Sequence, residues 1–155
     1  MSARGAISYV NMSKRDSSHR ASRSASDLLH RFYESFNQGD LDSVLELCTD
    51  DVELYQDPDV VEMVAALTPR GQERIAQYLR GWLDSWSDYH ARPQEFLQSG
   101  EQVAALTQLR ARGKNSQFEI EVDMADVFTL RDGRIARFRL YIQRADALES
   151  LGLEA

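Results

Sequence analysis

The most regular feature of this chain is a period-two alternation of apolar and polar residues in its C-terminal third. Six of the seven alternate positions from Phe118 to Leu130 are apolar, and the seventh is Asp126. Alternation of this kind predicts a strand with one buried face. A carboxylate on that face needs compensation, because burying an unpaired charge is costly. Asp126 is therefore the first candidate for a chemical role.

Helical spacing of apolar residues dominates the first half of the chain, and strand patterns dominate the second half. Ser26 or Asp27 can cap a first helix that Gly39 ends, and Asp40 can cap a second, short helix. Helices are expected over residues 27–37, 41–48 and 72–86, with residues 59–69 ambiguous. Strands are expected over residues 51–55, 94–98, 102–112, 117–130 and 134–143. Helices followed by an antiparallel meander predict an α+β fold.

The turns between the last strands allow a prediction of which residues face each other. Asp132-Gly133 is a strong signal for a two-residue hairpin loop. With that loop, Asp126 lies opposite Arg139 on the inner face, followed along the strand pair by Met124 opposite Tyr141 and Val122 opposite Gln143. A β-bulge would reverse this parity. Asp126 and Arg139 then form either a structural ion pair or part of a pocket, and both interpretations stay open.

The preceding turn predicts a consistent inner face. A four-residue loop over residues 113–116 places Val103 opposite Asp126, with the apolar side chains of both strands on the same side. On the solvent side it pairs Arg110 with Glu119. The outer face of the last hairpin is more apolar than open water tolerates, which predicts a homodimer packed through this sheet face; its residues are Ala125, Val127, Phe138, Leu140 and Ile142.

Composition and charge narrow the class of protein. The 155 residues, 43% of them hydrophobic, are expected to form one domain over residues 27–155. Residues 1–26 are rich in Ser and Arg and carry a net charge of +4, so they are expected to be a disordered tail. The whole chain has a net charge of −7, so residues 27–155 carry −11. A charge this negative repels phosphate groups and argues against nucleic acid as a partner.

Other function classes receive no support from the residue pattern. No apolar run approaches the length of a membrane span, so no membrane association is expected. Cys48 is the only cysteine, which fits a reducing, cytoplasmic setting. His19, His30 and His90 are scattered without the spacing of a metal site, and no cofactor is expected.

Three segments together resemble a known family. The segments "DLLHRFYESFNQGDLDSVLELCTDDVELYQDP", "GQERIAQYLRGWLDSW" and "TLRDGRIARFRLYIQRADALESLGL" are similar, in order and spacing, to SnoaL-like members of the nuclear transport factor 2-like superfamily. The resemblance covers residues 27–153. It implies a cone-shaped α+β fold in which a curved antiparallel sheet wraps around helices and leaves an apolar pocket, and it implies frequent homodimers. Relatives include polyketide cyclases, ketosteroid isomerase and non-catalytic binding modules, so the fold alone does not give the function.

Individual positions follow from this resemblance. Asp57, which precedes Pro58, corresponds to the general base of ketosteroid isomerase, and Asp126 corresponds to its oxyanion-hole Asp. The helix-borne Tyr of that enzyme falls on Phe32, with Tyr33 one place away. In SnoaL-type cyclases an acid/base Asp lies where this chain has Gln143. A Gln cannot transfer a proton.

Two hypotheses result from these observations. The first is a cofactor-independent isomerase or cyclase that binds a hydrophobic cyclic molecule and uses Asp57 and Asp126 for acid/base chemistry. The second is a ligand-binding or dimerisation module of the same fold without catalysis. In either case the residues expected to contact the ligand are Tyr33, Tyr55, Trp82, Trp86, Arg139, Tyr141 and Gln143.

Overall fold

A curved five-stranded sheet forms the centre of the molecule. The structure is a computed structural model that describes residues 19–55, 70–115 and 118–153. The strand order is β1-β5-β4-β3-β2, with β1 and β5 parallel and the other neighbours antiparallel. The strands are β1 (Cys48–Tyr55), β2 (Trp86–Ser99), β3 (Gln102–Gly113), β4 (Glu119–Arg131) and β5 (Arg134–Tyr141).

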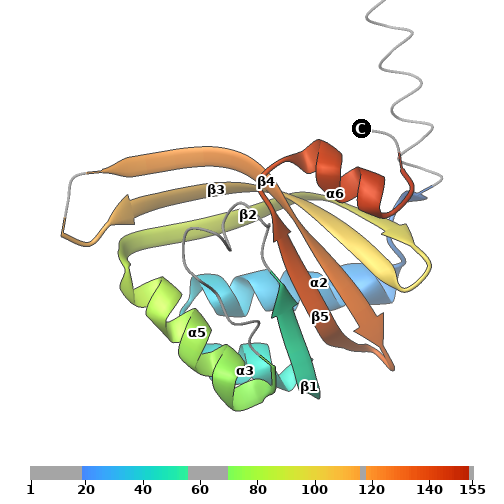
Figure 1. Ribbon diagram of the computed structural model, residues 1–155, viewed down its shortest axis with the longest axis horizontal. Helices are drawn as coiled ribbons and strands as arrows, with labels where there is room; N and C mark the ends of the chain where they lie inside the picture. The colour runs from blue at the N-terminus through green and yellow to red at the C-terminus, as the bar shows by residue number, and fades with distance from the viewer. Residues whose placement is uncertain (1–18, 56–69, 116–117, 154–155) are drawn as a thin grey trace, which may run out of the picture.

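Helices lie on both sides of this sheet (Figure 1). The helices on the concave side, which packs the larger core, are α2 (Arg23–Asn37), α3 (Leu41–Glu46) and α5 (Gln72–Asp84). On the outer side α6 (Arg144–Ser150) covers part of β3, β4 and β5. The predicted α+β class with a curved sheet around N-terminal helices is therefore confirmed.

The N-terminal helix begins earlier than the sequence predicts. Ser22, not Ser26 or Asp27, is its N-cap, and its hydroxyl accepts a hydrogen bond from the Ala25 N–H at 3.2 Å. The Ala21 N–H also donates to the Phe96 carbonyl at 3.1 Å. The last residues assigned to the tail thus belong to the fold, because Ala21 and Ala25 are buried in the core. Residues 1–18 and the ambiguous segment 59–69 lie outside the described residues.

The last hairpin has the predicted turn and a different register. Asp132 and Gly133 both adopt positive φ, at 54° and 76°, as a two-residue loop between Arg131 and Arg134 requires. One residue later β5 carries a bulge, so that Ile135 pairs with Leu130 while Arg137 pairs with Thr129.

Ala136 is the extra residue of this bulge, and it shifts every later pair of β5 by one position. Asp126 consequently lies opposite Leu140, and Arg139 lies opposite Val127. The predicted Asp126–Arg139 pair is therefore wrong, although Asp126 does face inward and lines the cavity of the concave side.

The β3–β4 pair keeps the predicted parity and differs in register by two residues. Ala105, not Val103, lies opposite Asp126. On the outer face Arg110 pairs with Glu121 at 3.4 Å, and Glu119 forms its ion pair with Arg112. A shift of two residues leaves each side chain on the same face of a strand. The prediction of one mostly apolar inner face therefore holds for these two strands.

The outer face is not the open apolar surface that the sequence suggests. Phe138 and Leu140 point to the concave side because of the bulge and line the cavity there. Ala125 and Val127 remain on the outer side but are buried under α6, in a cluster with Leu148. Of the five residues proposed for a dimer interface, Ile142 is the exposed one, at 44%.

Arg144 connects α6 to the sheet through hydrogen bonds. Its guanidinium donates to the Thr107 carbonyl at 2.7 Å and to the Met124 carbonyl at 3.2 Å. Thr107 pairs with Pro93 of β2, which has no N–H to offer. Arg144 thus supplies donors at the edge of an irregular part of the sheet, where β2 also has a bulge. None of the helices among residues 19–55, 70–115 and 118–153 is long and apolar enough to cross a bilayer.

Candidate functional site

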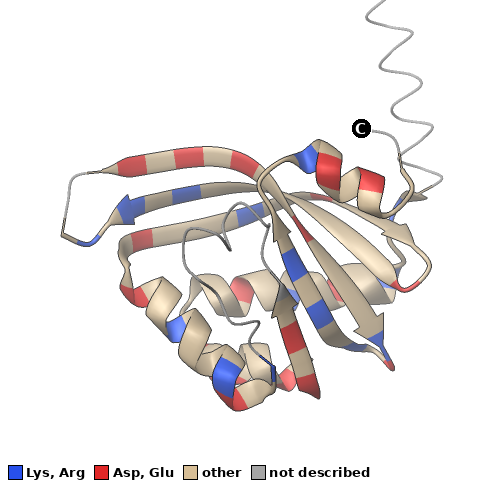
Figure 2. Ribbon diagram, in the orientation of Figure 1, with Lys and Arg blue, Asp and Glu red and all other residues tan. Residues whose placement is uncertain are grey.

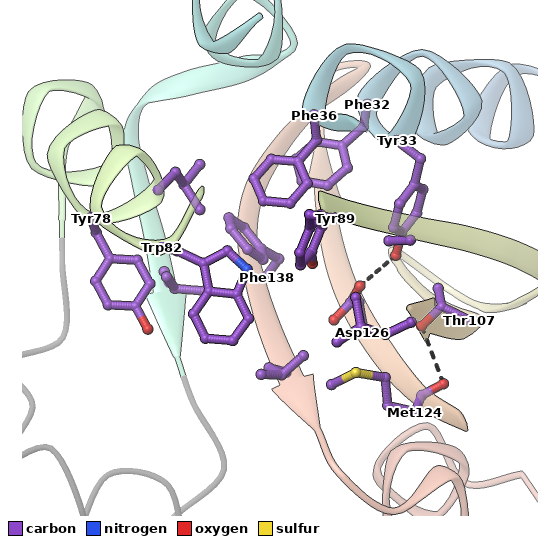
Figure 3. A pocket seen from close by; sticks show the side chains of 15 residues that line it. Phe32, Tyr33, Phe36, Tyr78, Trp82, Tyr89, Thr107, Met124, Asp126 and Phe138 are labelled. Atoms are coloured by element: carbon purple, nitrogen blue, oxygen red, sulfur yellow. Dashed lines mark hydrogen bonds between the residues drawn. The ribbon is translucent and has the colours of Figure 1, made fainter. Parts of the chain in front are cut away.

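A small aromatic cavity lies between the concave face of the sheet and helices α2 and α5 (Figure 3). Its volume is about 80 Å³. The aromatic side chains that line it come from four elements and are Phe32, Tyr33, Phe36, Tyr78, Trp82, Tyr89 and Phe138. Helical spacing brings Phe32, Tyr33 and Phe36 to the buried stripe of α2, which packs against the sheet.

Asp126 places a carboxylate in this apolar lining. Strand alternation on β4 directs its side chain to the concave side, between Met124 and Phe128 along the strand. Its Oδ2 accepts a hydrogen bond of 2.5 Å from the Tyr33 hydroxyl on α2 (Figure 3). The compensation that the carboxylate needs thus comes from a phenol and not from a guanidinium.

The surroundings of Asp126 favour its neutral form. Burial raises the pKa of the Asp126 carboxyl to about 6, and the hydrogen bond from Tyr33 opposes that rise. Burial and the Asp126 charge together raise the pKa of Tyr33 well above its ordinary value, so this hydroxyl stays protonated and remains a donor. A carboxyl with a pKa of about 6 can gain and lose a proton near neutral pH, which suits an acid/base group.

Tyr89 supplies a second phenol near Asp126. Burial and the Asp126 charge raise the pKa of Tyr89, and a hydrogen bond from Trp82 opposes the rise. Its ring packs edge-on against Phe36, with 5.4 Å between ring centroids. Asp126, Tyr33 and Tyr89 therefore form a polar group enclosed by aromatic side chains (Figure 3).

The structure brings three of the predicted site residues together. Tyr33, Trp82 and Asp126 line the cavity, whereas Trp86 packs against Trp82 with centroids 5.7 Å apart and does not reach the lining. Asp57 lies outside the described residues, and Tyr55 is described through its backbone alone, as the last residue of β1. The catalytic role of Asp57 stays a prediction.

The remaining predicted contact residues lie away from the cavity. Arg139 and Tyr141 are on the outer face of β5, because the bulge at Ala136 reverses their parity. Gln143 is exposed and precedes α6 as its N-cap residue. These three residues cannot contact a ligand in the aromatic cavity without a change of register.

Several lining residues were not singled out from the sequence. Tyr89 and Ala91 belong to β2, which is much longer than the expected strand 94–98. Pro93 and the bulge at Gln94 interrupt the alternation of apolar and polar residues in β2, so the sequence does not indicate that its first half is part of the strand. The spacing of Tyr78 with Trp82, four residues apart on α5, was visible as a helical stripe.

Metal and thiol chemistry find no support in the described parts of the chain. No cluster of three or more His, Cys, Asp or Glu side chains suited to a metal ion occurs there. Cys48 is buried, and burial raises the pKa of its thiol to about 12, so it is a poor nucleophile at neutral pH.

Comparisons with known proteins place this arrangement in a family. Three solved structures share the fold: a nuclear transport factor 2-like protein of unknown function from Burkholderia pseudomallei, TerC crystallised with polyporic acid, and IdmH, a candidate polyketide cyclase from Streptomyces antibioticus. The first is 20% identical with a TM-score of 0.70, over 84% of this chain and 98% of that one. The corresponding values are 19%, 0.69, 83% and 97% for TerC, and 25%, 0.64, 83% and 98% for IdmH.

Sequence comparison identifies the family directly. A search of functionally curated proteins gives no match. The family model of the SnoaL-like domain matches residues 29–138, which include most of α2, all of β1 to β4 and the first part of β5. This match covers more than half of the chain and agrees with the fold of the solved structures. The chain therefore belongs to the SnoaL-like domain family.

Proposed function

We propose that this protein binds an apolar, ring-containing small molecule in the aromatic cavity and catalyses proton transfer at a carbon next to a carbonyl group. The observation that carries the proposal is Asp126, a carboxyl with a pKa of about 6 that accepts a 2.5 Å hydrogen bond from Tyr33 inside an apolar lining. Isomerisation and intramolecular cyclisation both begin with such a proton transfer.

Each polar residue has a distinct role in this proposal. Above pH 6 the ionised Asp126 removes a proton from the substrate carbon, and the protonated carboxyl returns it in the following step. The Tyr33 hydroxyl remains a donor and keeps the carboxyl in place. Tyr89 is positioned to donate to an oxygen of the substrate when negative charge develops there. Asp57 stays the sequence-based candidate for a second acid/base group.

The size of the cavity restricts how a substrate binds. A volume of about 80 Å³ is below the several hundred Å³ of typical ligand pockets. Only the reacting end of a multi-ring substrate fits beside Asp126, and the remainder extends past Trp82 and Tyr78 at the α5 side of the cavity. TerC, which shares the fold, was crystallised with polyporic acid, and this supports a small molecule as the ligand of this fold.

Exchange of hydrogen for deuterium tests this chemistry without knowledge of the natural substrate. 2-Tetralone, a bicyclic ketone with acidic α-hydrogens, is incubated with the protein in D₂O at pD 7.5, and the loss of the α-proton signals is followed by NMR. The protein is expected to accelerate exchange, and Asp126→Asn to remove the acceleration. Asp123→Asn is the matched control, because Asp123 lies on the same strand with an exposed side chain.

A non-catalytic binding module of the same fold is the second candidate. It is favoured by the lining itself, in which Asp126 is the one carboxylate among the described residues. The same experiment separates the two functions. Binding of 2-tetralone, seen as quenching of Trp fluorescence, without accelerated exchange supports the module and contradicts the enzyme.

The homodimer expected from the sequence stays a prediction, and the interface that the sequence suggests for it is not available. Packing through Ala125, Val127, Phe138 and Leu140 is excluded by their burial or inward direction. Charge complementarity beside β5 (Figure 2) is used within the chain, where Arg137 pairs with Glu53 of β1.

A further inference from the structure

Arg139 is the residue whose position the structure explains least. It lies on the outer face of β5, half-buried, and its Nε has no hydrogen-bond partner although the atom is fully buried. No carboxylate of the described residues forms an ion pair with its guanidinium. The guanidinium instead stacks over the ring of Tyr141, at 4.8 Å from the ring centroid. A half-buried cation without a counter-charge is unfavourable.

A concave site surrounds this guanidinium. The cavity has a volume of about 300 Å³ and lies between the outer face of the sheet and the end of α6. Its lining residues other than Arg139 are Gln102, Val127, Thr129, Arg137, Tyr141 and Ser150, none of which is acidic. Arg137 forms an ion pair with Glu53 at 3.4 Å, whereas the positive charge of Arg139 is not neutralised by any residue that lines the site.

Hydrogen-bond donors in the same cavity are also available. Gln102 and Thr129 face each other across β3 and β4, and neither side chain is hydrogen-bonded to another described residue. The Ser150 hydroxyl already donates to the Ala147 carbonyl at 2.6 Å. One fixed guanidinium fork beside an amide and a hydroxyl is the donor arrangement that recognises an oxyanion.

We propose that this outer cavity is a second binding site, separate from the aromatic cavity, for a small molecule that carries a carboxylate or phosphate group. The anion accepts from the terminal N–H groups of the Arg139 guanidinium, and the buried Nε–H beside them reports on its binding. The stacking of Arg139 on Tyr141 holds the fork in place before the anion arrives. Gln102 and Thr129 then complete the coordination from the neighbouring strands.

The site is independent of the chemistry proposed for Asp126. The two cavities lie on opposite faces of the sheet, and no residue lines both of them. Loss of binding at Arg139 would therefore leave proton exchange on 2-tetralone unchanged. Conversely, failure of the exchange experiment would leave anion binding intact.

Titration followed by NMR of arginine Nε–H groups tests the proposal. The ¹⁵N-labelled protein is titrated with potassium phosphate in one series and potassium acetate in another, at pH 7 and constant ionic strength. The Arg139 signal is assigned by its absence in Arg139→Gln. A saturable shift of that signal by one or both anions is expected, and the series that saturates at lower concentration identifies phosphate or carboxylate as the preferred group.

Two variants and a control make the result specific. Thr129→Val removes one donor and is expected to weaken binding several-fold, and Arg139→Lys, which keeps the charge and loses the fork, to weaken it roughly tenfold or more. Arg110→Gln, at an exposed ion pair on the outer face of β3, is expected to leave binding unchanged. A shift that never saturates, or one shared equally by all arginines, would overturn the proposal. A signal that depends on protein concentration but not on anions would also overturn it, because a second copy would then occupy the site.

Discussion

Replacing Asp126 by Asn is expected to stabilise the protein at neutral pH, although it removes a charged group from a hydrogen bond. Burial raises the pKa of this carboxyl from 3.8 to about 6, so the folded protein disfavours the ionised form. At about 1.4 kcal/mol per pKa unit, ionisation costs about 3 kcal/mol of folding free energy above pH 6. Asp126 borders a cavity that can admit water, so this value is an upper limit.

The side-chain amide introduced by Asp126→Asn would offset part of this gain. The pKa of about 6 already includes the hydrogen bond from Tyr33, but the new NH₂ group brings donors that the apolar lining satisfies poorly, with a loss of about 1 kcal/mol. A net gain of about 1–2 kcal/mol is therefore expected for Asp126→Asn at pH 7.

The dependence on pH follows from the direction of the pKa shift. Because the folded protein holds this proton more tightly than the unfolded chain, the contribution of Asp126 to stability falls as pH rises from about 4 to about 6. Urea unfolding, followed by Trp fluorescence from pH 4 to pH 8, measures the difference between parent and variant. That difference is expected to rise across this window in favour of the Asn variant and then stay level. Asp123→Asn, at an exposed position of the same strand, is the matched control. A variant less stable than the parent at every pH would refute the reasoning.

Further outcomes concern the groups around Asp126 and the connections between elements. Tyr33→Phe is expected to move the pKa of the Asp126 carboxyl above about 6, because the hydrogen bond from Tyr33 lowers it; ¹³C NMR of the carboxyl measures this. Arg144→Gln should cost about 1.5–3 kcal/mol in urea unfolding and speed hydrogen exchange in α6, while Arg110→Gln should stay within about 0.5 kcal/mol of the parent. Asn37→Ala, which removes two hydrogen bonds of 2.8 and 2.9 Å between α2 and the backbone of β2, should cost about 1–3 kcal/mol in the same assay.

The sequence pattern predicts most of the helices and strands, but not α6, the full length of β2, or the register of the last three strands. Alternation identified the inward position of Asp126, and Asp132-Gly133 identified the turn, both of which the structure confirms. The single extra residue Ala136 sets the register of all later residue pairs between β4 and β5. Bulges have no strong sequence signal, because most small residues fit them, so the partner of Asp126 could not be found by counting along the strands.

The sequence alone gives part of the evidence for Tyr33 as the hydrogen-bond partner of Asp126. Tyr33 belongs to a clear helical stripe, but only the packing of α2 on β4 shows that its hydroxyl reaches the carboxylate. Helix α6 is not among the helices that the sequence analysis predicts. Its cover over Ala125 and Val127 is what removes the apolar surface that suggested a dimer interface there.

The bulge at Ala136 has a consequence for sequence change in this chain. Upstream of it Ile135 faces the concave side, and downstream Phe138 does so at an offset of three instead of two or four. Pairing Ala136 regularly with Thr129, without the bulge, would exchange the two faces of the C-terminal half of β5, bringing Arg139 and Tyr141 toward Asp126 and exposing Phe138. Deleting Ala136 would instead leave a regular ladder in which every later residue of β5 keeps its partner. Ala136 lines neither cavity, yet its unpaired position determines which residues of β5 face each of them.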